Sequence, residues 1–583
     1  MVSLAVDLEG RATVTAARRR PGTVARRRHG TRALAFIAVA AALFVLVGYP
    51  MAWLALKSLQ SPSGAGLTVQ NFVTVFTTLR YLTPVRNSLA VATAVGFIDL
   101  AIAVPMAWAV VRTDMPAKAL VRGCVIGAFV TPGFLGAIAW ALLAGPNAGW
   151  LNKLWMFVTG AGSGLFNIYS LPGIVFVISL YTFPFVFLLT TTALELMSSE
   201  MEDAAAILGA SRWRTMRMVT IPLVLPALLA GFIIAFLEAI ADLGAPLVLA
   251  VPARVQVITT QLFQFYEFPS QVEVAAAYSL PLLLITGALL YLQRRLLARK
   301  GYSTFSGKGG AQRVIRLGHW RYVPLAWCLA VATLSLFLPS LTLLSAATAK
   351  GWARGWGWEN FTLGNFRFIL VEHPAAPSAI THSFVFSAAA AFAAIWLAFL
   401  TAYIVNRRLV RGGWVLGYAA MMPFVIPGIV LAMGFLAAYT RHPLALYGTA
   451  WILILAYTSR FLPLAYTTSD SALKSIDADL EDAARIAGAG RFATLREVTL
   501  PLIKRGILGG WLLVMIAAMR ELSTAIFLFS ANTKVMSTVL IDFSEAGEFE
   551  RLSALGIIML ALTLALTLVG HRVVGRRFIA CAE

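Results

Sequence analysis

The stretch Glu202-Asp203-Ala204-Ala205-Ala206-Ile207-Leu208-Gly209-Ala210 returns 279 positions later as Glu481-Asp482-Ala483-Ala484-Arg485-Ile486-Ala487-Gly488-Ala489. In each copy a proline follows the glycine by thirteen residues, Pro222 in the first copy and Pro501 in the second. Both copies are polar, and both lie between long apolar runs. An ungapped polar repeat in such a chain predicts a duplicated protein that presents one docking surface twice.

The composition around the repeat indicates a protein that crosses a membrane many times. The chain has 583 residues, of which 59% are hydrophobic and 13% charged, and its mean hydropathy is +0.80. Soluble domains carry about 25% charged residues. The three cysteines have neither metal-ligand spacing nor the pattern of a disulfide framework. We therefore exclude a soluble enzyme and a disulfide-stapled secreted domain.

Apolar runs long enough to span a bilayer divide the chain into two sets of six, because each span needs roughly 20 residues. They fall at 33–56, 88–111, 123–144, 172–194, 223–251, 275–293, 323–346, 383–405, 414–439, 448–467, 505–530 and 552–570. We predict an all-α polytopic membrane protein of about 12 transmembrane helices, arranged as two parallel six-helix repeats. The expected divisions are a basic cytoplasmic tail (1–32), a first half (33–297), a cytoplasmic linker (298–322) and a second half (323–583).

Short matches outside the polar repeat support the division into halves. Asn87-Ser88 corresponds to His382-Ser383 at the start of the second span of each half, and Pro132-Gly133 corresponds to Pro427-Gly428 in the third. Asp242-Leu243 matches Glu521-Leu522 at the same offset as the polar repeat (242 to 521). Because each half holds an even number of spans, both halves are expected to have the same orientation.

The net charge of +21 comes from basic residues spread over the loops between spans. The positive-inside rule places the tail, the linker, the C-terminal end and both polar repeats on the cytoplasmic face. A nucleic-acid partner is not expected, since the basic residues form no single stripe. Binding of the arginine-rich tail to anionic membrane lipid is an alternative role for that segment.

The polar repeat itself predicts a helical elbow. A helix is expected from Glu195 to Leu208, a sharp turn at Gly209 because glycine takes positive φ freely, and a second short helix ending at Pro222. The groups expected to enter a groove on a partner are Ala205, Leu208, Trp213 and Met216 in the first copy and Ala484, Phe492 and Leu495 in the second. Glu202 is expected to pair with a basic residue at the rim of that groove. The alternative is a simple helical hairpin at the membrane interface.

This pattern resembles the EAA loop of bacterial ABC importer permeases of the binding-protein-dependent class, and the repeats extend the resemblance over about residues 60–570. Asp203 and Asp482 depart from the motif, since they stand where its first alanine usually is. The resemblance implies that the following residues form loops that couple to an ATPase: Glu202, Asp203, Ala204, Ala205, Gly209, Pro222, Glu481, Asp482, Ala483, Ala484, Gly488 and Pro501.

Two permease halves fused in this way resemble the ferric iron importer permeases. Weaker echoes are Ala137-Ile138-Ala139-Trp140 and Ala241-Asp242-Leu243-Gly244-Ala245-Pro246. The resemblance implies import of ferric iron through the bacterial inner membrane, with a periplasmic or lipid-anchored binding protein as donor. Related permeases carry thiamine, aminoethylphosphonate or hexose phosphates, and these substrates remain open.

The resemblance also implies two copies of a separate ABC ATPase subunit as partners. ATP and Mg would be used there, and this chain is expected to be neither an enzyme nor the holder of a cofactor. Its one phosphate-loop look-alike is Ser306-Gly307-Lys308-Gly309. A phosphate loop needs glycine five residues before the Gly-Lys pair and Ser or Thr after the lysine. Position 302 is Tyr and position 309 is Gly, so both requirements fail.

Charged residues at span depth are costly, roughly 2.5–3.5 kcal/mol each, and need a reason. The candidates are Asp99, Glu238, Asp242, Arg460, Arg520 and Glu521. Asp242 and Glu521 hold equivalent positions, so we expect them to face each other across a pathway, with Glu238 nearby as a third lining or gate residue. Pairing between helices is the alternative. Ferric iron prefers oxygen ligands, which Asp242, Glu238 and Tyr278 could supply.

Two other classes of protein remain as alternatives. An ion-coupled secondary transporter with parallel repeats would need ion-binding polar groups on discontinuous helices, and it would have no use for twin cytoplasmic loops. An integral membrane enzyme would need a nucleophile with a base, or clustered metal ligands, and the sequence offers neither.

Overall fold

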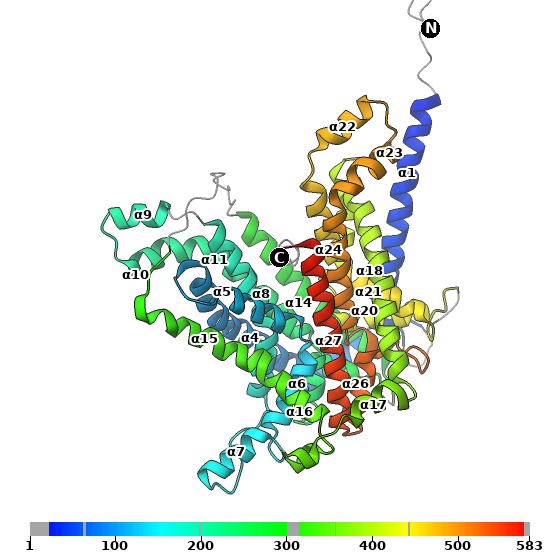
Figure 1. Cartoon of the computed structure of the whole chain (residues 1–583). Helices are drawn as coiled ribbons and strands as arrows, with labels where there is room; N and C mark the ends of the chain where they lie inside the picture. The colour runs from blue at the N-terminus through cyan, green and yellow to red at the C-terminus, as the bar shows by residue number, and fades with distance from the viewer. Residues whose placement is uncertain are drawn as a thin grey trace, which may run out of the picture.

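The computed structural model describes residues 23–61, 66–197, 200–267, 269–299, 314–355, 357–440 and 443–575. Within these ranges the chain is helical, and its only extended pairing is three isolated bridges. The tail up to residue 22 and the linker from 300 to 313 fall outside the described residues, as do the look-alike at Ser306-Gly307-Lys308-Gly309 and position 302. Figure 1 shows two helical bundles standing side by side.

Corresponding helices occur in the same order along the chain in the two halves. The first half has α1 Thr23–Leu43, η1 Phe44–Gly48, α2 Tyr49–Ser58, α3 Gln70–Thr77, α4 Leu79–Arg112, α5 Lys118–Val130, α6 Gly133–Ala144, α7 Trp150–Thr159, α8 Leu171–Leu196, α9 Glu200–Ile207, α10 Arg212–Thr215, η2 Met216–Thr220, α11 Ile221–Ala241, α12 Gly244–Leu249, α13 Ile258–Gln264 and α14 Val272–Arg299. The second half has η3 Gly318–Arg321, α15 Tyr322–Ala332, η4 Thr333–Phe337, α16 Leu338–Ala347, η5 Trp352–Arg354, η6 Trp358–Asn360, α17 Gly364–Arg367, η7 Phe368–Glu372, α18 Ala376–Asn406, α19 Trp414–Met421, η8 Met422–Phe424, α20 Gly428–Tyr439, α21 Ala450–Lys474, α22 Ala478–Ile486, α23 Arg491–Thr494, η9 Leu495–Thr499, α24 Leu500–Met519, α25 Ala525–Leu528, α26 Met536–Glu545 and α27 Phe549–Val574.

Three long helices form the centre of each bundle, α4, α8 and α11 in the first half and α18, α21 and α24 in the second. Small residues let the backbones approach, as is common between membrane helices. On α18, Ala390, Ala394 and Ala398 recur every four residues and are fully buried. Close approach of this kind makes the centre of each half a stiff unit.

The first span of each half packs on the other half as well as on its own, where α2 contacts α14 and α16 contacts α27. The helices α1 and α2 pack on α18, α19 and α20 of the second half. The helices α15 and α16 pack on α4, α5 and α6 of the first half. In Figure 1, α1 accordingly stands with the second bundle and α15 with the first. The two halves are interlocked, which the sequence does not indicate.

The count of spans agrees with the predicted architecture. Among the described residues nine helices are long and apolar enough to cross a membrane, or up to eleven if each of two bent pairs counts as one span. The helix α21 is the counterpart of α8 and falls outside this count, since Arg460, Asp470 and Lys474 make it more polar. The prediction of an all-α polytopic membrane protein built from two repeats is confirmed.

The third span of each half is bent, which the predicted runs 123–144 and 414–439 do not show. The pair α5 and α6 turns by 96°, and the pair α19–η8 and α20 turns by 107°. Each bend falls at the matched Pro-Gly, where Pro132 and Pro427 have extended backbone. Proline cannot donate the helical hydrogen bond, so both first segments end with carbonyl groups that lack a partner within their own helix.

Candidate functional site

The two copies of the polar repeat form two elbows of the same geometry. In the first elbow α9 and α10 flank Gly209, and in the second α22 and α23 flank Gly488. These glycines have φ of +81° and +94°. A Cβ added to either would meet nothing within 4 Å, so glycine is required there for its backbone conformation. The predicted sharp turn is confirmed at both positions.

The backbone hydrogen bonds of the turn are repeated at the offset of the sequence repeat. Ala210 donates to the carbonyl of Ala205 in the first elbow, and Ala489 donates to that of Ala484 in the second, both at 3.0 Å. Such bonds satisfy the carbonyl groups left free at a helix end. The elbows therefore share one conformation, and they lie at the same end of the molecule (Figure 1).

Each elbow presents a matched pair of exposed apolar side chains. Ile207 and Ile486 are 86% and 88% exposed, and Trp213 and Phe492 are 68% and 76% exposed. Leu208 is also exposed, whereas Met216 is half-buried. No role is predicted for the two isoleucines from the sequence, although an identical isoleucine at the same place in both copies is a signal that the sequence contains.

The motif glutamates face the protein rather than a partner. Glu481 accepts hydrogen bonds from Arg407 at 2.8 Å and from Thr499 at 3.0 Å. In the first elbow Glu202 accepts one from Thr220 at 2.7 Å and lies 3.8 Å from the guanidinium of Arg112. The expectation that Glu202 pairs with a partner's groove is thus corrected. Each glutamate ties its elbow to the end of a neighbouring span and to the start of the next one.

Two further expectations about the elbow are wrong. The predicted helix Glu195–Leu208 is divided, because α8 ends at Leu196 and α9 begins at Glu200. The second short helix does not end at Pro222, since it continues through a π-helical turn into α11, as its counterpart does at Pro501. A π-helical turn shifts the hydrogen-bond pattern just before a residue that cannot donate. Each elbow is therefore continuous with a membrane-spanning helix.

The remaining motif positions differ in exposure. Ala204 and Ala483 are exposed, while Ala205 and Ala484 are partly buried under the turn. Asp482 is paired with Arg485 at 2.7 Å on the surface of α22. The space available on the exposed alanine side allows close approach by another protein.

A second group of predicted residues lies between the halves, at the ends of α11 and α24. Asp242 follows α11, and its Oδ1 accepts the backbone N–H of Gly244 at 2.9 Å. Glu521 is the second residue after α24, and its Oε1 accepts the backbone N–H of Thr524 at 3.0 Å. Both carboxylates hold a turn that starts a short helix, α12 and α25 respectively. The two residues have equivalent structural roles.

These two turns are neighbours across the boundary between the halves. A Cβ added to Gly244 would lie 3.6 Å from Leu522 Cδ2. Asp242 interacts electrostatically with Glu238 and with Glu521. The structure thus brings all three predicted pathway residues together.

Two arginines complete this central charge cluster. Arg520 donates to the carbonyl of Phe129 in the other half, and Arg460 donates to that of Ile426 at 2.9 Å. Both carbonyl groups lie at the bends of the third spans. Glu238 interacts electrostatically with both arginines. The alternative to a pathway lining, in which these charged residues pair between helices, therefore also describes part of the cluster.

Other polar candidates lie away from this cluster. Asp99 is fully buried and accepts from Thr182 at 2.6 Å. The hydroxyl of Tyr278 donates to the carbonyl of Tyr81 at 2.7 Å, so Tyr278 does not join Asp242 as an iron ligand. Within the described ranges no three His, Cys, Asp or Glu side chains are placed to hold a metal ion.

Two interlocked bundles of like topology, with twin elbows at one end and charged turns between them, define a polytopic permease made of two fused halves. The chain belongs to the family described as the binding-protein-dependent transport system inner membrane component, whose model matches residues 86–301 and 394–578. It is thus the membrane-spanning permease component of an ABC importer, a transporter subunit.

Several proteins of known name are similar to the chain. The ferric transport system permease protein FbpB of Actinobacillus pleuropneumoniae is 27% identical over 512 residues, which cover 84% of this chain and 71% of that protein. The putative 2-aminoethylphosphonate transport system permease protein PhnV of Salmonella typhimurium is 26% identical over 240 residues, 41% of this chain and 89% of the relative. A crystal structure of a bacterial alginate ABC transporter, in complex with an alginate pentasaccharide-bound periplasmic protein, aligns at 16% identity with a TM-score of 0.38. That alignment covers 50% of this chain and 100% of the other.

Proposed function

We propose that this permease imports ferric iron across a bacterial inner membrane, with two ABC ATPase subunits docked on its two elbows. A periplasmic or lipid-anchored binding protein delivers the iron to the face opposite the elbows. The observation that carries the coupling role is the matched apolar surface of the elbows, Ile207 with Trp213 and Ile486 with Phe492. The iron assignment is supported by the permeases named for ferric transport, whose similarity covers most of the chain.

The elbows suit the transmission of a rigid-body movement. Each is held to its bundle by the motif glutamate and continues directly into a long helix, α11 or α24. A force applied to an elbow therefore moves a whole bundle rather than bending a loop. ATP-driven closure of two ATPases would bring the elbows together and rock the halves, a movement of known type in transporters. ATP and Mg are used in the partner subunits only.

The central turns are the proposed gate of the pathway. Asp242 and Glu521 hold equivalent turns on opposite halves, so rocking of the halves separates or closes them. Three carboxylates, Glu238 included, face two arginines and leave the cluster with a formal charge of −1. Carboxylate oxygen suits a hard cation such as ferric iron. We propose that these residues make weak contacts with iron and so guide it through the pathway.

A small phosphonate is the second candidate substrate. Arg460 and Arg520 lie in the central charge cluster, and guanidinium groups recognise phosphate and phosphonate oxygens bidentately. The similarity to the phosphonate permeases covers 41% of this chain.

Reconstitution distinguishes the two substrates. Liposomes would hold the permease with its partner ATPase and binding protein, and uptake of radiolabelled ferric iron and of 2-aminoethylphosphonate would be measured with and without ATP. We expect ATP-dependent uptake of iron only. Uptake of the phosphonate alone would overturn the iron assignment but keep the importer, and uptake of both solutes without ATP would overturn the ATP-driven mechanism.

A further inference from the structure

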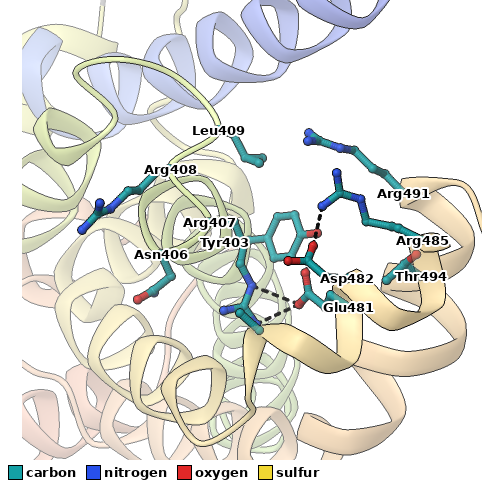
Figure 2. A pocket seen from close by; sticks show the side chains of 11 residues that line it. Tyr403, Asn406, Arg407, Arg408, Leu409, Glu481, Asp482, Arg485, Arg491 and Thr494 are labelled. Carbon is teal, nitrogen blue, oxygen red and sulfur yellow. Dashed lines mark hydrogen bonds and ion pairs between the residues drawn. The ribbon is translucent and has the colours of Figure 1, made fainter.

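A cavity of about 270 Å³ lies beneath the second elbow, between α22 and α23 on one side and the end of α18 with its following loop on the other. Its volume is far larger than the ~30 Å³ that one water molecule occupies in the liquid. Four of the 11 lining residues are arginines, namely Arg407, Arg408, Arg485 and Arg491 (Figure 2). A concentration of guanidinium groups around a cavity predicts a site for an anion.

The lining carries an excess of positive charge. Only two carboxylates line it, Glu481 beside Arg407 at 2.8 Å and Asp482 beside Arg485 at 2.7 Å. Four guanidinium groups against two carboxylates leave a formal charge of +2. Each of these carboxylates engages one of the four arginines.

The equivalent place in the first half has the opposite charge. Thr113 stands where the second half has Arg408, Asp114 where it has Leu409, and Ala206 where it has Arg485. In the sequence, the equivalent positions of the first half hold two arginines and three carboxylates, a formal charge of −1. The two halves therefore differ in charge at these positions.

The loop that follows α4 in the first half is bonded to the end of the linker. Ile315 donates to the carbonyl of Arg112 at 2.8 Å, and Leu317 donates to the carboxylate of Asp114 at 2.9 Å. This loop corresponds to the loop that lines the cavity in the second half. The first-half loop thus contacts another segment of the chain, whereas its counterpart in the second half lines a basic cavity.

We propose that this cavity binds a phosphate group, supplied either by the headgroup of an anionic phospholipid or by free phosphate. Arginine matches phosphate geometry through paired N–H donors. The cavity is lined by the end of the long helix α18, and basic sites at the ends of membrane-spanning helices take anionic headgroups. The bound phosphate bridges the second elbow to the loop after α18. By stiffening the second elbow, the bound phosphate would affect transport only if the proposed coupling role holds. Binding itself does not depend on that role.

The test uses the purified full chain without partner subunits, so its outcome is independent of transport. Thermal unfolding would be followed in sodium phosphate and in sodium chloride of equal ionic strength, and native mass spectrometry would compare phosphatidylglycerol with phosphatidylcholine. The variant Arg408→Thr with Arg485→Ala copies the first half. The control Arg411→Ala removes the same kind of charge from the same loop but outside the cavity lining.

We expect phosphate or phosphatidylglycerol to bind the wild type and Arg411→Ala alike, and to bind the double variant at least tenfold more weakly. Stabilisation by phosphate without lipid retention assigns free phosphate, and lipid retention alone assigns the headgroup. If the double variant does not fold, titration of Arg408→Ala replaces it, since Arg408 is exposed. Equal binding of both probes by wild type and variant, or no binding by either, overturns the proposal.

Discussion

Glu481 illustrates how a single residue connects an elbow to the membrane bundle. Its Oε1 accepts both Nε and Nη2 of Arg407, at 3.1 and 2.8 Å, together with the hydroxyl of Thr499. The side chain is only 7% exposed. A carboxylate with several charge-assisted hydrogen bonds is a strong tie. The sequence repeat identified this glutamate, but its partners lie 74 and 18 residues away, and one sequence contains no record of such pairings.

Removal of this tie is expected to destabilise the second half. Glu481→Gln leaves the half-buried Arg407 without its carboxylate, and breaking such a pair costs roughly 3–5 kcal/mol. Thermal unfolding in detergent should show a clear loss. Glu202→Gln should cost less, since Arg112 is 3.8 Å away, and Asp482→Asn should cost little, because its pair is exposed. Equal effects of all three changes would contradict the assignment.

The glycines at the two turns provide a second test at the residue scale, one that changes the backbone conformation. Gly488→Ala and Gly209→Ala place a Cβ at φ near +90°, at a cost of about 1–2 kcal/mol each. We expect reduced coupling of ATP hydrolysis to transport, because the elbow changes its angle. Gly490→Ala is the matched control, since Gly490 has φ of −69° and open space around it. A Gly490 effect as large as that of Gly488 would show that the turn conformation is not what matters.

At the scale of elements, the bends of the third spans depend on two arginines from other parts of the chain, which donate hydrogen bonds to the carbonyl groups at the bends. The matched Pro-Gly pairs are visible in the sequence as matches between the halves, but each run is predicted only as one span, with no bend. Periodicity reports which residues are apolar, and an apolar run of span length does not reveal a break of 96° or 107°. The capping donors, Arg460 and Arg520, were recognised as charges at depth, whereas their acceptors could only be found from the structure.

Coupling between Arg520 and the carboxylates can be measured by a double-mutant cycle. Arg520→Met removes the donor to Phe129 and leaves Glu238 less compensated. The loss in thermal stability should be partly restored by Glu238→Gln in the same chain, with an interaction free energy of about 1–3 kcal/mol, as for residues in one charged network. Additive effects of the two changes would mean that Glu238 does not depend on Arg520.

At the scale of the whole molecule, the packing of each first span on the other half makes the halves one unit. Two like halves in the same orientation followed from the repeat, since matched loops imply matched topology. This packing between the halves did not follow, because apolar faces of membrane helices can pack against many neighbours. We predict that the chain, cut within the linker at 300–313 and expressed as two pieces, still co-purifies as a pair. Removing residues 1–58 from the first piece should greatly weaken the pair, and separation of the intact pieces would contradict the interlocked fold.

The most direct test of the account is whether the elbows hold the ATPase. Ile207→Asp together with Ile486→Asp places a charge on the exposed apolar face of each elbow and leaves the motif glutamates Glu202 and Glu481 unchanged. We predict an inserted, folded permease from which the co-expressed ATPase subunit no longer co-purifies. The control Phe157→Asp changes a residue that is 88% exposed on α7, at the opposite end of the molecule, and should retain the ATPase. Full ATPase recovery with the doubly charged elbows would contradict the central claim.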